Sequence, residues 1–105
     1  MKLQSILNDC LIHWKKISGF DFTLLHSNDD VYLTTALKKL PATSRLQTFR
    51  EGTALSIANT RCCLYKIFHQ NELLYLLIVW GSGENASVIG ELAVYQIQSL
   101  LKACL

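Results

Sequence analysis

The sequence predicts an α+β domain in which an antiparallel sheet of about five strands carries the N- and C-terminal helices on one face. Three observations lead to this prediction. Both ends of the chain have apolar residues at helical spacing, the segments between them resemble strands grouped in hairpins, and half of the 105 residues are apolar. A chain of this length suffices for one compact domain and not for two. Residues 1–105 are therefore expected to form a single domain.

The first helix is expected over residues 3–16, because the apolar side chains there form one stripe at helical spacing. Lys15 and Lys16 fall in its last turn, where cations suit the helix dipole. Ser18 and Gly19 then end it. The stripe consists of Leu3, Ile6, Leu7, Cys10, Leu11 and Trp14.

A first hairpin is expected from residues 20–27 and 31–37. The first of these segments alternates apolar and polar residues at its start, and the second is rich in residues that favour strands. Between them, the sequence NDD at 28–30 is typical of a turn.

The segment 38–52 is ambiguous. Pro41 interrupts any strand or helix there. Ser44 is a suitable N-cap for a short helix over 45–51, which would end at Gly52.

A second hairpin is expected further along the chain. Residues 53–59 have modest strand character, and 60–68 and 73–80 have more. The sequence HQNE at 69–72 is expected to form the turn between the last two. Because 73–80 is apolar on both faces, it should be a central strand or be covered on both sides.

The sequence GSGEN at 81–85 leads into a long helix expected over 86–104. Its apolar residues spread wider than one stripe, so the helix should bury one face on the sheet and a second face against something else. They are Val88, Ile89, Leu92, Val94, Tyr95, Ile97, Leu100 and Leu101.

No catalytic or metal-binding motif is evident. The four cysteines form no C-x-x-C pair, so a structural zinc site is not expected. Adjacent strand residues point to opposite faces, so Cys62 and Cys63 are expected to act as packing residues rather than as a dithiol. The sequence GSG at 81–83 lacks the remaining features of a phosphate-binding loop. The chain is therefore expected to be neither an enzyme nor a cofactor-binding protein.

Charge and hydropathy argue against a nucleic-acid-binding, membrane-spanning or secreted protein. The net charge is +2 and the basic residues are scattered, so direct nucleic-acid contact is not expected. No apolar run reaches the roughly 18–20 residues that span a bilayer, and the N-terminus does not have the pattern of a signal peptide. A cytoplasmic location without membrane contact is the expectation.

A ligand pocket is the most specific hypothesis from the residues themselves. Arg45, Arg50 and Thr53 lie in a segment that is expected to cross one sheet face, and arginine suits bidentate capture of a carboxylate. Tyr65 and Lys66 lie in the strand that would floor the same pocket. The alternative, in which 44–53 is a solvated surface loop, stays open.

The predicted order of elements is that of the PAS/GAF/profilin-like group. Two segments resemble a family of bacterial transcription regulators of the PucR/CdaR type, which control purine catabolism and sugar-diacid use. Residues 5–35, SILNDCLIHWKKISGFDFTLLHSNDDVYLTT, resemble the opening of their small sensory domains. Residues 71–105, NELLYLLIVWGSGENASVIGELAVYQIQSLLKACL, resemble the closing hairpin and the helix of the GAF/PAS-like domain. Residues 36–59 match nothing in that pattern.

The resemblance implies a sensory domain that binds a small metabolite such as a carboxylate. It also implies a helix that continues toward a helix-turn-helix, with this chain as an N-terminal fragment of a longer regulator or a partner of one. The surplus apolar face predicts a homodimer through helices 3–16 and 86–104. The alternative is a protein-interaction scaffold of the roadblock/longin kind, which shares the order of elements and has no ligand pocket.

Overall fold

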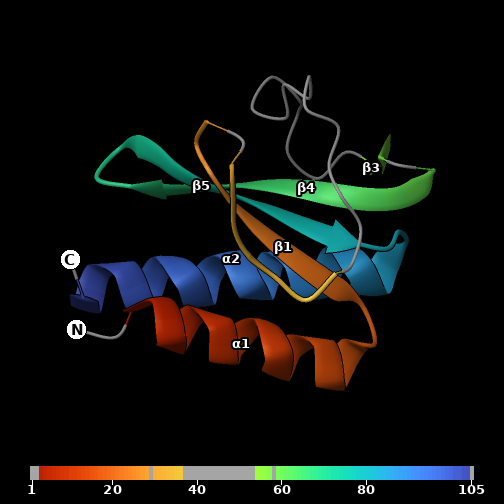
Figure 1. Ribbon diagram of the computed structural model, residues 1–105, viewed down its shortest axis with the longest axis horizontal. Coiled ribbons are helices and arrows are strands. Elements are labelled where there is room, and N and C mark those ends of the chain that lie inside the picture. The colour runs from red at the N-terminus through yellow and green to blue at the C-terminus, as the bar shows by residue number, and fades with distance from the viewer. Residues whose placement is uncertain (1–2, 29, 37–53, 58, 105) are drawn as a thin grey trace.

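The computed structural model describes residues 3–28, 30–36, 54–57 and 59–104 (Figure 1). Its five strands form one antiparallel sheet in the order β2-β1-β5-β4-β3. The predicted α+β class, with five strands and a helix near each end of the chain, is confirmed. The elements in chain order are α1 (Leu3–Ser18), β1 (Asp21–His26), β2 (Val31–Thr34), β3 (Ala54–Ile57), β4 (Thr60–His69), β5 (Glu72–Trp80) and α2 (Glu84–Cys104).

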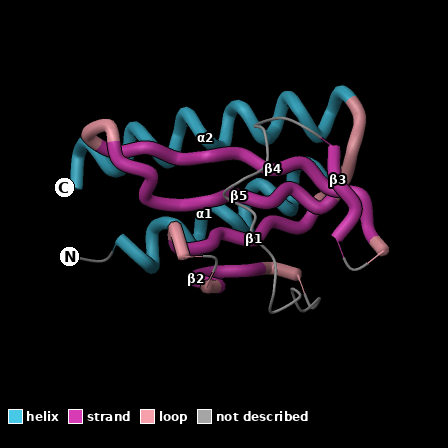
Figure 2. Tube along the Cα trace, turned by 90° about the horizontal axis from the view of Figure 1, so that it is seen from above, coloured by secondary structure: helices cyan, strands magenta, loops and turns pink. Residues whose placement is uncertain are grey.

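The two helices form a single layer on one face of the sheet. They lie side by side and run in opposite directions, so the start of α1 and the end of α2 lie at the same end of the layer (Figure 1). Seen from above, the sheet lies against this helix layer, with β2 and β3 at its two edges (Figure 2). The common face predicted for the helices is therefore present.

Strand β5 occupies the centre of the sheet, between β1 and β4. Leu77 of β5 pairs with Leu24 of β1 on one side and with Tyr65 of β4 on the other. The six residues from Tyr75 to Trp80 are all buried. A strand buried on both faces has apolar residues at successive positions, so the prediction of a central strand over 73–80 is confirmed.

The sheet separates two apolar clusters. The cluster facing the helices joins one side of β1, β4 and β5 to the inner faces of both helices. The cluster on the other face consists of Leu25, Ile57, Cys62, Leu64, Leu76, Ile78 and Trp80. The helix-facing cluster includes Leu7, Leu11, Trp14, Phe22, Leu24, Cys63, Tyr65, Ile67, Leu77, Val79, Ala93, Ile97 and Leu101.

The helix ends follow local chemistry. Helix α1 ends at Ser18 because Gly19 adopts a φ of +80° and donates its N–H to the carbonyl of Lys15 at 2.8 Å. Helix α2 begins at Glu84, two residues earlier than expected. The reason is that the carbonyl of Gly83 already accepts the N–H of Ser87 at 3.1 Å, which closes the first turn.

Two other boundaries differ from the prediction. The turn between β4 and β5 has two residues instead of four: His69 pairs with Glu72, and Gln70 and Asn71 both have positive φ. Strand β2 ends at Thr34, because its hydroxyl accepts the N–H of Ala36 at 3.0 Å and so draws the chain out of the ladder. The short helix predicted over 45–51 lies outside the described residues.

Candidate functional site

The predicted ligand-binding residues do not come together among the described residues. Arg45, Arg50 and Thr53 lie outside them. The side chain of Tyr65 is buried in the helix-facing cluster, and its hydroxyl donates to the carbonyl of Ser87 in α2 at 3.4 Å. Lys66, the next residue of β4, is half-buried and its side chain points to the opposite face. The sheet lies between these two side chains, so they do not line one cavity.

The adjacent cysteines divide between the two clusters, as predicted. Cys63 packs in the helix-facing cluster, and Cys62 packs in the cluster on the other face. Burial, with a smaller contribution from the charge of Cys63, raises the pKa of the Cys62 thiol to about 11. Burial also raises the pKa of the Cys63 thiol. Both groups stay protonated at neutral pH, so neither is an activated nucleophile.

An aromatic group lies at the end of the sheet where β1 meets β2. The rings of Tyr32 and Tyr75 are stacked, with centroids 5.4 Å apart, and the ring of His26 lies 4.6 Å from that of Tyr32. Burial, together with the neighbouring Tyr32, raises the pKa of Tyr75. A phenol that holds its proton more tightly is a poor acid and stays protonated at neutral pH, so this group is best explained by packing.

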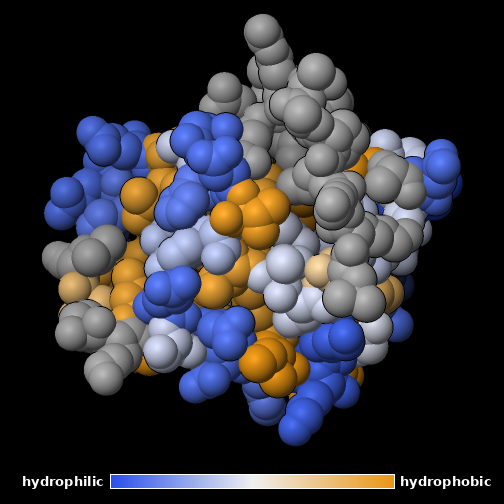
Figure 3. All heavy atoms as spheres, viewed as in Figure 1, coloured by the Kyte–Doolittle hydropathy of each residue, from blue (hydrophilic) through white to orange (hydrophobic). Residues whose placement is uncertain are grey.

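The largest exposed apolar side chains gather on the outer face of the helix layer. Val88, Leu92 and Tyr95 follow one another at i, i+4 and i+7 along α2, and they are 51%, 58% and 73% exposed. Ile17 at the end of α1 is 63% exposed. Figure 3 shows one side of the molecule, where hydrophobic groups reach the surface in separate patches, one of them over α1.

The exposed side of α2 has a charged flank and an uncharged stripe beside it. The charged residues of the whole helix are Glu84, Glu91 and Lys102, and helical spacing places all three along one flank. A helix facing water usually has charged residues opposite its buried stripe, and this flank lies there. The uncharged stripe beside the flank consists of Asn85, Val88, Leu92, Tyr95, Ser99 and Ala103.

A groove of about 410 Å³ runs between the two helices beside this stripe. The indole Nε1 of Trp14 in α1 donates to Oε1 of Gln96 in α2 at 3.0 Å, which joins the helices at the groove. Apolar and uncharged side chains make up most of its lining, so it suits an apolar partner. The lining residues are His13, Trp14, Ile17, Ile89, Leu92, Tyr95, Gln96 and Ser99.

A second groove, of about 480 Å³, lies on the other side of α2, against the β4–β5 turn. The N–H of Phe68 donates to Oε1 of Gln98 at 3.2 Å beneath it. Tyr95 and Ser99 line both grooves. Tyr95 therefore forms a ridge between two hollows, a shape that another helix face can fit.

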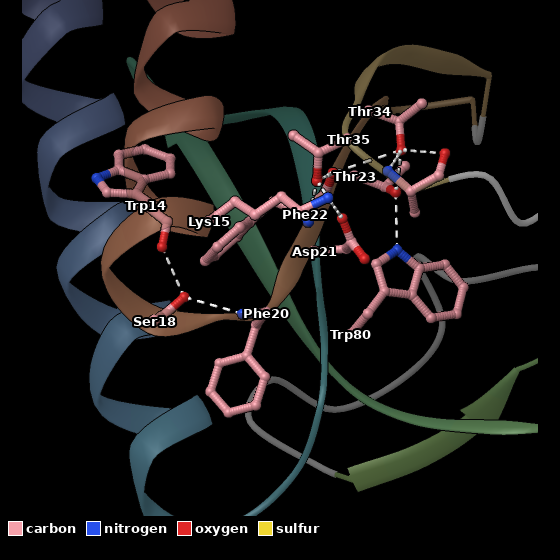
Figure 4. Close-up of polar contacts among 11 residues, drawn as sticks. Trp14, Lys15, Ser18, Phe20, Asp21, Phe22, Thr23, Thr34, Thr35 and Trp80 are labelled. Atoms are coloured by element: carbon pink, nitrogen blue, oxygen red, sulfur yellow. Dashed lines mark hydrogen bonds and ion pairs between the residues drawn. The ribbon is translucent and has the colours of Figure 1, made fainter.

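A polar network at the start of β1 is the densest among the described residues (Figure 4). Thr23 is buried, and its Oγ1 lies 2.7 Å from that of Thr34 and accepts the Nε1–H of Trp80 at 2.8 Å. Lys15 and Asp21 form an ion pair at 2.9 Å, and the hydroxyl of Thr35 donates to the same carboxylate. These groups satisfy one another, so the network joins β1, β2 and β5 instead of presenting free groups to a ligand.

The second apolar face predicted for the C-terminal helix corresponds to the exposed surface formed by Val88, Leu92 and Tyr95 of α2. The wide spread of apolar residues over 86–104 was its signal: Ile89, Ile97 and Leu101 are buried, whereas Val88 and Leu92 are exposed. The sequence did not indicate that residues of α1 would line the groove. Nor did it indicate that Gln96 would accept a hydrogen bond from Trp14.

Comparison of the chain with protein-family models, with curated proteins and with solved structures finds no match. The resemblance to the PucR/CdaR sensory domain therefore stays a prediction. Within the described residues, no helix combines the length and the apolar character needed to cross a membrane. Nor do three or more histidine, cysteine or acidic side chains cluster there in a way that would hold a metal ion.

Proposed function

We propose that this chain is a regulatory domain that acts by pairing with a second copy through its helix layer. In keeping with the resemblance, we place it in the cytoplasm as the sensory domain of a bacterial transcription regulator. The observation that carries the proposal is the uncharged stripe on the exposed side of α2, with Val88, Leu92 and Tyr95 exposed beside an apolar groove. Burying such a surface against a like surface removes apolar area from water without burying a charge.

A contact between sheet and helix supports transmission of a signal. Tyr65 of β4 reaches α2, where its hydroxyl bonds to Ser87 and its ring lies against Gly90. A change in the position of β4 would therefore displace α2. A small molecule that favours one position of β4 would shift the population between two packings of the paired helices. We propose a carboxylate as this ligand, with Arg45, Arg50 and Thr53 as its binding residues and Lys66 beside them.

The pairing is tested by measuring molar mass with sedimentation velocity over a wide concentration range. The wild type is expected to dimerise, and Leu92→Glu is expected to be monomeric because it places a charge in the middle of the interface. Ile12→Glu is the matched control. Ile12 is also an exposed apolar helix residue, but it does not line the groove. A wild type that stays monomeric at high concentration would contradict the proposal.

The ligand is tested separately by thermal shift with glucarate and with allantoate, a sugar diacid and a ureido acid. At least one is expected to raise the melting temperature of the wild type and to have no effect on Arg50→Ala. Equal shifts in both proteins would remove Arg50 from the site.

The second candidate is a scaffold of the roadblock/longin kind that pairs without a ligand. One observation favours it: of the two grooves described above, one lies at the surface between α1 and α2 and the other at the end of β4 and its turn, so neither enters the core between the helices and the centre of the sheet. A dimer that forms fully without any small molecule, and is unchanged by either acid, would select this candidate.

A further inference from the structure

We infer that the second copy packs with its α2 antiparallel to the first, about a two-fold axis level with Ala93, so that Glu84 of each copy lies beside Lys102 of the other. The inference rests on the proposed dimer and gives it a register. It follows from the positions of the charges along α2, from the geometry of two-fold pairing, and from the level of Ile17 in the same layer.

Two opposite charges lie on one flank of α2, near its two ends. Glu84 and Lys102 lie in the first and last turns of α2, 18 residues apart. At 3.6 residues per turn this separation is a whole number of turns, so both side chains lie on the same flank of the helix. Among the described residues the ion pair is Lys15–Asp21, and neither Glu84 nor Lys102 has an ionic partner there.

The two-fold symmetry of a dimer determines which residues of the two copies meet. When two copies of a helix pack face to face and antiparallel, the two-fold axis brings the same flank of each copy together. A residue at a given distance before the axis then meets the residue at that distance after it. Ala93 is midway between Glu84 and Lys102, so an axis at this level creates two acid–base pairs. Glu91, the other charge on this flank, falls level with Tyr95, and its nearest charge across the axis is Glu91 of the other copy, about 6 Å further along.

The apolar side chains agree with the same axis. Leu92 lies next to it, and Val88 and Tyr95 lie on either side. The hydrogen bond from Trp14 to Gln96 places these two residues at one level of antiparallel helices (Figure 1), so Ile17 is about level with Ala93. The exposed side chain of Ile17 therefore also lies near the axis, where it can meet its symmetry mate.

A parallel pairing does not give these contacts. In that arrangement opposite flanks meet, so the flank with Glu84 and Lys102 would face the side where the partner's α1 lies. The helix dipoles would also be aligned side by side, whereas in the antiparallel arrangement they oppose each other. The charges and the dipoles thus favour the antiparallel register.

The test is a charge exchange. Glu84→Lys and Lys102→Glu each replace two attractive pairs with two repulsive ones, so each variant alone should have a dimer dissociation constant raised roughly ten-fold at low salt. An equal mixture of the two variants has two attractive pairs in the heterodimer. With one variant isotope-labelled, native mass spectrometry should therefore show the heterodimer in excess. The double exchange in one chain should restore the homodimer.

Glu91→Lys is the control, because it changes net charge as Glu84→Lys does but leaves one like-charged pair across the axis, as in the wild type. Circular-dichroism melting checks that each variant folds. If the wild type dimerises but the single exchanges do not weaken it, or if the mixture shows no excess of heterodimer, the register is wrong and the proposed dimer stands. If the wild type is monomeric, both fail.

Discussion

The ring of Tyr65 packs so closely on Gly90 that a Cβ at position 90 would lie 2.4 Å from Cε2 of the ring. Gly90→Ala is therefore expected to lower the free energy of unfolding by about 1–3 kcal/mol, although alanine is the better helix former by about 1 kcal/mol. Urea unfolding measures this loss. In a Tyr65→Leu background the same substitution should cost less, since the smaller side chain leaves room. An equal cost in both backgrounds would show that the contact is not the cause.

Thr23→Val is expected to lower the free energy of unfolding by about 1–3 kcal/mol, because it leaves the buried Nε1–H of Trp80 without its acceptor. The measurement is chemical unfolding of Thr23→Val, Trp80→Phe and the double variant. The two effects should be non-additive, with Thr23→Val costing less once the indole is absent. Additive losses would mean that the hydrogen bond contributes nothing of its own.

Cys62 is expected to resist N-ethylmaleimide at pH 8 in the folded protein, whereas the half-buried Cys104 at the end of α2 reacts. Mass spectrometry of peptides after timed labelling gives the rate at each position. Because the folded pKa of Cys62, about 11, lies above its ordinary value of 9.0, the protonated thiol stabilises the fold fully below pH 9. That contribution is lost as the pH rises through 11. Cys62→Ala should therefore lose less stability over this range than the wild type.

The ion pair between Lys15 and Asp21 should contribute modestly and in a pH-dependent way. Burial alone would raise the pKa of Asp21, but hydrogen bonds from Lys15 and Thr35 and the charge of Lys15 outweigh it, and the pKa lies below its usual value. A lowered pKa stabilises the fold above the unfolded pKa of about 4, and this contribution disappears as the pH falls below it. We expect Asp21→Asn to cost under about 1 kcal/mol at pH 7, because both groups are partly exposed. The cost should vanish in strong acid, and a constant difference at all pH values would contradict this explanation.

The alternation of a strand was enough to predict which sheet face several residues occupy. It placed Cys62 and Cys63 in different clusters, which the structure confirms. By the same rule the side chains of Tyr65 and Lys66 point to opposite faces of the sheet. The prediction that both would floor one pocket is inconsistent with that rule. Periodicity likewise predicted the helices and the second apolar face of 86–104, because spacing along a helix depends only on local geometry.

Contacts between distant segments could not be predicted from strand alternation or helical periodicity. The hydrogen bonds from Trp80 to Thr23 and from Trp14 to Gln96 depend on which strands and helices become neighbours, and local spacing does not contain that information. The boundaries at Thr34 and Gly83 depend on individual hydrogen bonds, which strand and helix preferences do not describe. The segment with Arg45, Arg50 and Thr53 lies outside the described residues, so the predicted ligand contacts stay a prediction.

The central position of β5 has a consequence for how the chain folds. Its pairing with β1 joins residues as distant in the sequence as Asp21 and Trp80, while β1–β2 and β3–β4 are local hairpins. Neither hairpin can extend into a full sheet until this strand enters between them. The rate of refolding should therefore be governed by a late, long-range closure, on the order of milliseconds to seconds. During synthesis, the sheet would stay divided into two halves until its last strand has emerged from the ribosome.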